Sequence, residues 1–118
     1  MKNFSFENLI VWQKAKELVK FVYRATQPFP KEERFGLTSQ LRRSSLSVAS
    51  NLAEGSGRQS GKDKAHFTTI AYGSLMEAVN QSIIAFELGY LTEDHYWEIR
   101  ERAEEISRML TSLKDSQL

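Results

Sequence analysis

The placement of proline and glycine divides this chain into four blocks of helical length. Its only prolines are Pro28 and Pro30, and its glycines stand at positions 36, 55, 57, 61, 73 and 89. Both residue types interrupt helices, proline because it lacks an amide hydrogen and glycine because its backbone is flexible. Apolar residues recur at helical spacing within each block, and no segment reads convincingly as a strand. The pattern predicts helices at about 7–26, 37–54, 61–88 and 93–115.

Local signals support these boundaries. Ser5, Ser60 and Thr92 stand where the first, third and fourth helices need an N-cap, and Gly89 ends the third helix. Four amphipathic helices joined by short loops favour an all-α, antiparallel up-and-down four-helix bundle, which we expect to form a single domain over residues 1–118. Its predicted core includes Leu41, Val48, Leu52, Ile70, Ile84, Ile99, Ile106 and Leu110.

Composition narrows the class of protein. The 118 residues are 41% hydrophobic and include no cysteine, so neither a disulfide framework nor a thiolate metal site is possible. The N-terminal segment carries Glu7 and Asn8 within its apolar region and lysines after Trp12, which is unlike a signal peptide or a membrane span. We therefore expect a soluble, cytoplasmic protein without a membrane partner.

Charge is distributed unevenly along the chain. Residues 1–64 contain 12 Lys/Arg against 6 Asp/Glu, whereas residues 65–118 contain 4 against 9. The halves could attract each other within the fold or between subunits, and the basic half could face a phosphate backbone. Solvated helix faces alone account for such a skew equally well.

The second predicted helix carries a polar stripe beside its apolar one. Serine and asparagine weaken a helix unless close packing or hydrogen bonding compensates, so the stripe predicts a contact surface rather than a solvated face. Gly73 and Ser74 in the third helix, which are also poor helix formers, suggest that a neighbouring backbone approaches closely there. We interpret these positions as an oligomer interface or a buried polar network made of Gln40, Ser44, Ser47, Asn51, Glu54, Ser74 and Glu77.

Glu77 is open to two interpretations, because it stands in an otherwise apolar part of the third helix. A buried carboxylate is costly unless it is paired, and Arg42 or Arg43 would be the natural partner. Alternatively, the helix is rotated so that Glu77 faces water.

Catalysis and cofactor binding are poorly supported. The loop from Gly55 to Lys62 precedes a helix, but it lacks the spacing of a phosphate-binding loop and has Asp63 where Ser or Thr is required. Asp63 and His66 form half of a di-iron motif, and the other half is missing. We expect no enzyme activity, no catalytic residues, no metal, no cofactor and no small-molecule substrate.

Six motifs of this chain resemble motifs of a known family, and they occur in the same order at compatible spacing. They are FENLIVW at 6–12, Phe29-Pro30 with Glu33, GLT-QLRR at 36–43, Ser47 with NLAEG at 51–55, Ala71 with GSL-E at 73–77, and LGYL at 88–91. Together they resemble the bacterial four-helix-bundle proteins encoded in intervening sequences of 23S rRNA genes. Departures such as Val48 and Leu52, where isoleucine is common, are conservative.

The resemblance implies a cytoplasmic homopentamer with no known enzymatic activity, and the family itself has no well-defined role. The chain is also similar to the pentameric accessory protein of diversity-generating retroelements, which binds nucleic acid through a basic surface. The leading hypothesis is therefore a non-enzymatic oligomer that binds nucleic acid, and RNA is the nucleic acid that we expect. The alternative is a scaffold for partner docking with no nucleic-acid role. Candidate nucleic-acid contacts are Arg42, Arg43, Arg58, Lys62 and Lys64.

Overall fold

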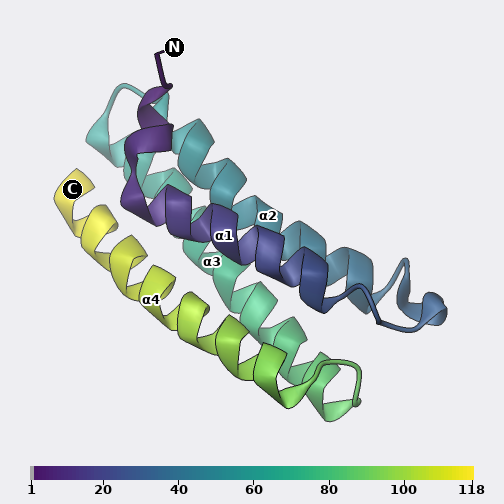
Figure 1. Ribbon diagram of the computed structural model, residues 1–118. Coiled ribbons are helices and arrows are strands. Elements are labelled where there is room, and N and C mark those ends of the chain that lie inside the picture. The colour runs from purple at the N-terminus through teal and green to yellow at the C-terminus, as the bar shows by residue number, and fades with distance from the viewer. Residues whose placement is uncertain (1) are drawn as a thin grey trace.

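Four long helices form an antiparallel bundle in the computed structural model, which describes residues 2–118 (Figure 1). They are α1 (Ile10–Ala25), α2 (Leu37–Ser56), α3 (Gly61–Glu87) and α4 (Glu93–Gln117), with short 3₁₀ helices η1 (Ser5–Asn8) and η2 (Lys31–Glu33). No strand occurs within the described residues. The predicted all-α, up-and-down bundle is confirmed.

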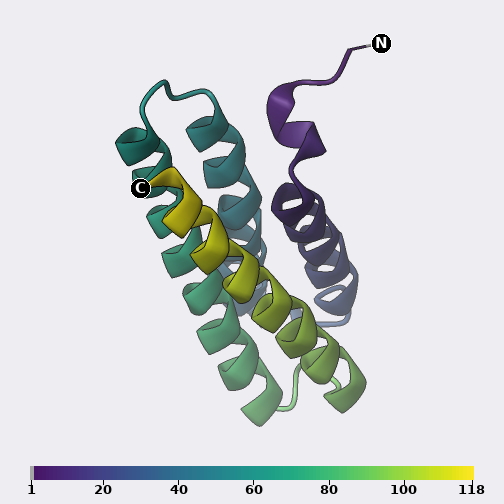
Figure 2. The ribbon, with the colours of Figure 1, turned by 90° about the vertical axis from the view of Figure 1, so that its left-hand side faces the viewer.

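The connections place three features at one end of the bundle. The N-terminal segment, the loop between α2 and α3 and the C-terminal end of α4 lie together, and the other two connections lie at the opposite end (Figure 1). A quarter turn shows α4 crossing the bundle and diverging from the start of α1 (Figure 2). Contact between α2 and α3 is the most extensive of any helix pair, and contact between α1 and α4 is the smallest among the neighbouring pairs.

Helix ends follow the predicted capping chemistry in the second half of the chain. The Ser60 hydroxyl accepts a hydrogen bond from the Asp63 amide at 3.0 Å, and the Thr92 hydroxyl accepts one from the His95 amide at 3.2 Å. Gly89 follows α3 in a left-handed conformation with φ of 82°, which a side chain would strain.

The predicted N-cap of the first helix is wrong, and α1 begins at Ile10, three residues after the predicted start. Ser5 begins η1 instead of capping a long helix, and Leu9 is extended between η1 and α1. The break allows the rings of Phe6 and Trp12 to pack with centroids 4.9 Å apart, and the Gln13 amide group donates to the Glu7 carbonyl at 2.8 Å. These contacts form across the break and could not be inferred from a helical pattern.

Six of the eight predicted core residues are buried, and two are not. Leu41, Val48, Leu52, Ile99, Ile106 and Leu110 are at most 3% exposed, whereas Ile70 is 39% and Ile84 is 43% exposed. The prediction for Ile70 and Ile84 is wrong because α3 turns a different face to the core. That face carries Ala71, Ala78 and Ala85, one every seven residues, and these small side chains let α3 approach its neighbours closely.

We expect Leu52→Ala to lower the free energy of unfolding by about 2–5 kcal/mol, because it removes a buried side chain and leaves a cavity. Ile10→Ala, at an exposed apolar position on α1, should change it by less than about 0.5 kcal/mol. Denaturant unfolding of both variants measures the difference. Equal losses would show that Leu52 is not a core residue.

Candidate functional site

The centre of the polar stripe joins α2 to α3. The Ser44 hydroxyl donates to the Gln81 side-chain oxygen at 2.7 Å, and both residues are buried. The Ser47 and Ser74 hydroxyls are hydrogen-bonded at 2.9 Å, and the Asn51 amide group donates to the Ser47 hydroxyl at 3.0 Å. The stripe therefore satisfies its own polar groups across the two helices, which is what a buried or half-buried polar network requires.

Small residues also bring the two helices together at the end of α2. A Cβ atom at Gly55 would lie 2.7 Å from the Cβ of Phe67, a distance that real Cβ atoms essentially never show. Gly55 is buried and stands in the last turn of α2, opposite the beginning of α3. Any larger residue there would push α3 away and disturb the hydrogen bonds of the stripe.

The ends of the stripe are exposed to solvent. Gln40 is exposed near the start of α2, and Glu54 near its end makes a salt bridge with Arg58 at 3.3 Å. This pair joins residues four apart on the surface, so it stabilises the helix end by only about 0.3–0.5 kcal/mol.

Glu77 faces solvent instead of the core. Its carboxylate accepts a hydrogen bond from the Gln81 amide group at 3.1 Å, and no ion pair in residues 2–118 includes it. Of the two interpretations of Glu77, the structure shows the water-facing one. Glu77 lines a cleft of about 400 Å³ together with Gln40, Arg43, Ser44 and Ser47.

Arg42 and Arg43 have different surroundings although they are adjacent in sequence. The Arg42 side chain reaches α1, where its Nε donates to the Thr26 hydroxyl at 2.9 Å and its Nη2 donates to the Tyr23 carbonyl at 3.2 Å. Its guanidinium also lies over the Tyr23 ring, 4.6 Å from the centroid. Arg43 is exposed on the cleft, with no ion-pair partner in the described chain.

The remaining candidate cations gather around the loop between α2 and α3. Arg58 lies over the Phe67 ring, 4.6 Å from its centroid, while Lys62 is exposed and Lys64 is half-buried in the first turn of α3. Neither lysine takes part in an ion pair within residues 2–118. The structure thus brings Arg58, Lys62 and Lys64 to one end of the bundle, whereas Arg42 and Arg43 lie further along α2.

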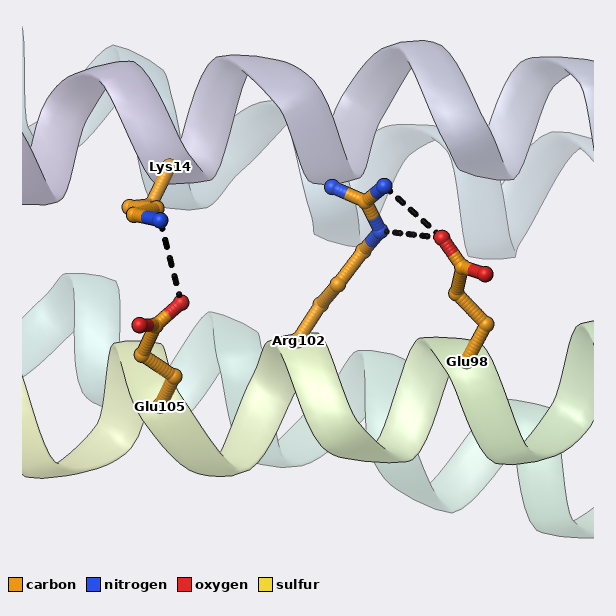
Figure 3. A network of polar contacts seen from close by, with 4 residues as sticks. All are labelled: Lys14, Glu98, Arg102 and Glu105. Atoms are coloured by element: carbon orange, nitrogen blue, oxygen red, sulfur yellow. Dashed lines mark hydrogen bonds and ion pairs between the residues drawn. The ribbon is translucent and has the colours of Figure 1, made fainter.

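Opposite charges from the two halves of the chain meet between α1 and α4. The Lys14 ammonium lies 3.5 Å from the Glu105 carboxylate across this helix pair (Figure 3). Nearby, Arg102 pairs with Glu98 at 2.7 Å and places its guanidinium over the ring of Phe21 in α1. Part of the charge skew therefore acts within the fold.

The candidate metal ligands do not converge. Asp63 and His66 are both exposed on α3, and His95 packs edge-on against the Phe21 ring at the other end of the bundle. Among residues 2–118, no three His, Cys, Asp or Glu side chains come close enough to hold a metal ion. None of the described helices is long and apolar enough to cross a membrane.

Sequence reasoning missed two surfaces. On α1, Lys16, Lys20 and Arg24 stand four residues apart on an exposed face, a regular spacing that could have been read from the sequence. On the outward side of α3, the apolar residues Ile70, Tyr72, Met76 and Ile84 are exposed, and so is Leu88 just after the helix. The second surface was hidden because the helical spacing of Ile70 and Ile84 predicts them to be core residues.

Comparisons with known proteins agree on the fold. The family model described as 23S rRNA-intervening sequence protein matches residues 7–112. No functionally curated protein matches the chain. A crystal structure from Bacteroides thetaiotaomicron, described as a protein with unknown function from the S23 ribosomal protein family, is similar with a TM-score of 0.80. The two share 23% sequence identity, and the match covers 89% of this chain and 98% of that chain.

We expect Arg42→Ala to lower the free energy of unfolding by about 1.5–3 kcal/mol, because it removes two charged hydrogen bonds that join α2 to α1. The neighbouring change Arg43→Ala should cost less than about 0.5 kcal/mol, because that side chain is exposed. Thermal or denaturant unfolding compares the two variants directly. A larger loss for Arg43→Ala would contradict the assignment.

Proposed function

This chain belongs to the 23S rRNA-intervening sequence protein family, and from that premise we propose that it is a non-enzymatic, oligomeric helical bundle that binds RNA through a basic surface. The observation that carries the proposal is the group of Arg58, Lys62 and Lys64 around one loop. No buried carboxylate neutralises this group, and its one salt bridge, between Arg58 and Glu54, is exposed. Lys62 and Lys64 have no ion-pair partner in residues 2–118, and Arg58 is held by an exposed pair that a phosphate backbone could replace.

Arg42 and Arg43 extend this surface to different degrees. Arg43 is exposed and reaches solvent without rearrangement. Arg42 must leave the Thr26 hydroxyl and the Tyr23 carbonyl before its guanidinium can meet a phosphate. In a single subunit, the loop cations and Arg43 therefore form the more accessible part of the proposed surface, whereas the Arg42 guanidinium is held at the end of α1.

Repetition of the surface in an oligomer would strengthen weak binding. Three or four cations on one subunit give little affinity at physiological salt, whereas several copies held in one assembly act at a high effective concentration. We propose a ring, with five subunits expected from the family resemblance stated above. No side chain arrangement that reads base edges is evident around the loop, so the binding is expected to depend on charge and shape more than on sequence.

Catalysis has no comparable support. The two histidines, His66 and His95, pack against the aromatic rings of Phe67 and Phe21 and are not hydrogen-bonded to a serine and a carboxylate as in a hydrolytic triad. The clefts are shallow openings between helices, and the one that includes Arg43 and Glu77 is lined by side chains that the polar stripe already uses. The proposal is therefore a binding protein.

A scaffold that docks a protein partner, with no nucleic-acid role, is the second candidate. The apolar outward face of α3 favours it, because exposed apolar surface of this extent is typical of protein contacts. The charge map of the assembled oligomer separates the two candidates. A continuous basic face favours RNA binding, and interleaved charges favour the scaffold.

We expect the combined change of Arg58, Lys62 and Lys64 to Ala to reduce the salt dependence of RNA binding. Each phosphate contact contributes about 0.7–0.9 to the slope of log affinity against log salt, so the triple variant should lose about 2–3. Gel shifts with structured RNA and duplex DNA across a salt series measure both slopes.

A charge-matched control uses Lys20 in α1 with Arg100 and Arg108 in α4, which are exposed in the interior of these helices and not at the end that carries the loop. Changing these three residues to Ala removes the same net charge and should leave the slope unchanged. If the loop variant binds RNA like the unmodified protein, or if the unmodified protein never binds at low salt, the scaffold function replaces the proposal.

A further inference from the structure

Gly73 has no packing role within its own chain. It stands in the middle of α3, where glycine is a poorer helix former than any residue except proline. A Cβ atom added there would find no heavy atom within 4 Å. At Gly55 and Gly61 the opposite holds, because a Cβ atom would collide with Phe67 or with the Gln117 carbonyl. The close approach that explains those two glycines is therefore missing at Gly73 within the chain.

The surface around Gly73 combines exposed apolar side chains with the uncharged polar residues Thr69 and Asn80 and the carboxylate of Glu77. Ile70, Tyr72 and Met76 are each 39% exposed, and Ile84 lies further along the same helix with 43% exposed. Residues 70, 73, 77 and 84 follow a helical spacing of three, four and seven, so Gly73 lies in line with Ile70 and Ile84. This line of larger side chains is interrupted at Gly73, which has no side chain.

Charge is nearly absent from this part of α3. Between Lys64 and Glu87, Glu77 is the only Asp, Glu, Lys or Arg residue. The solvent face of α4 is different, because Glu98 pairs with Arg102 and Glu104 pairs with Arg108, each four residues apart. In a monomeric bundle, each helix is expected to carry a charged outer face like that of α4. The outer face of α3 has the composition of a contact surface instead.

From these observations we infer that a second copy of this chain packs a helix across Gly73 and buries Ile70, Met76 and Ile84. The inference rests on the proposed assembly and identifies the surface through which the subunits meet. The absence of a side chain at Gly73 lets two helix backbones approach closely, as small residues do at tight helix crossings. The methyl group that an alanine would add has room in the monomer and none in such a contact.

Charge complementarity identifies the occupant as another copy. The cleft between α2 and α3 carries one exposed cation, Arg43, and one exposed carboxylate, Glu77, and neither has an ion-pair partner in residues 2–118. The outward side of α2 next to Arg43 adds Leu46, which is 46% exposed, and Ser50. The α2 side with its cation and the α3 face with its carboxylate are two different surfaces that can meet between copies. Arg43 of one copy can then pair with Glu77 of the next, which is the heterologous contact that a ring requires.

The inference predicts effects of opposite sign for Gly73→Ala. Alanine should raise the stability of the isolated bundle, because it favours the helix and meets no neighbour. The same methyl group should weaken assembly about ten- to hundredfold, as expected when an extra carbon is forced into a close contact. A purely structural role for Gly73 would not produce both effects.

The experiment compares the unmodified protein with Gly73→Ala, Ile70→Lys and Ile10→Lys by light scattering over a concentration series. Ile10 is the matched control, since it is also an exposed isoleucine but lies on α1 in the groove facing α4. We expect Ile70→Lys to be monomeric, Gly73→Ala to dissociate at higher concentration than the unmodified protein, and Ile10→Lys to assemble normally. Adding Gly73→Ala to the monomeric Ile70→Lys variant should raise its denaturant midpoint, which also shows that the variant is folded.

The outcomes separate this inference from the proposed function. If the unmodified protein assembles and both Gly73→Ala and Ile70→Lys keep its mass and dissociation constant, the contact lies elsewhere and only the inference is overturned. If the unmodified protein is a monomer at micromolar concentration, the proposed assembly fails together with the inference. RNA binding measured on the same samples tests the remaining part of the proposed function separately.

Discussion

The close contact between α2 and α3 is the constraint on which the rest of this structure depends. Ser44, Ser47 and Ser74 are small enough to let the helices approach and polar enough to bond across the gap, at 2.7 Å to Gln81 and 2.9 Å between the two serines. Gly55 allows the same approach at the end of the pair. Serine and glycine both weaken an isolated helix, so α2 gains its stability from this packing more than from its own propensity. The hydrogen bonds also specify register, because a shift along α3 would leave buried hydroxyl groups without partners.

Local chemistry explains how much of the fold could be predicted from the sequence. The ends of α3 and α4 depend on Ser60, Thr92 and Gly89, which act within one turn of the chain, so they were predicted within a few residues. Burial of Ile70 and Ile84 was predicted wrongly because helical spacing identifies a stripe but not which of two stripes meets the core. The alanines at 71, 78 and 85 settle that choice through the distance between helices, which is a tertiary property. The hydrogen-bond partners of Arg42 could not be predicted either, because Tyr23 and Thr26 lie at the end of α1, far from Arg42 in the sequence.

The bundle divides into two pairs of helices that differ in charge. Helices α1 and α4 carry most of the charged residues and pair some of them with one another, as Lys14 does with Glu105. Helices α2 and α3 have long uncharged stretches, in which the exposed polar residues include Ser50, Thr69 and Asn80. Charged residues keep a surface solvated, whereas a surface depleted of charge and containing exposed isoleucines loses little on desolvation. This division favours an assembly in which α2 and α3 meet other subunits and α1 and α4 face solvent.

Under the proposed assembly, the position of the loop cations has a geometric consequence. Arg58, Lys62 and Lys64 lie at the end of the bundle where η1 and the C-terminal end of α4 also lie, and the exposed apolar residues of α3 lie along the side. A contact along the side places neighbouring bundles next to one another without covering the ends. The loops of successive subunits would then remain open to solvent and repeat at a fixed spacing, and a polyanion could contact several of them at once. Self-association would take Arg43 into the contact between subunits, whereas the loop cations stay outside it. The assembly would then supply the multivalency that nucleic-acid binding through the loops needs.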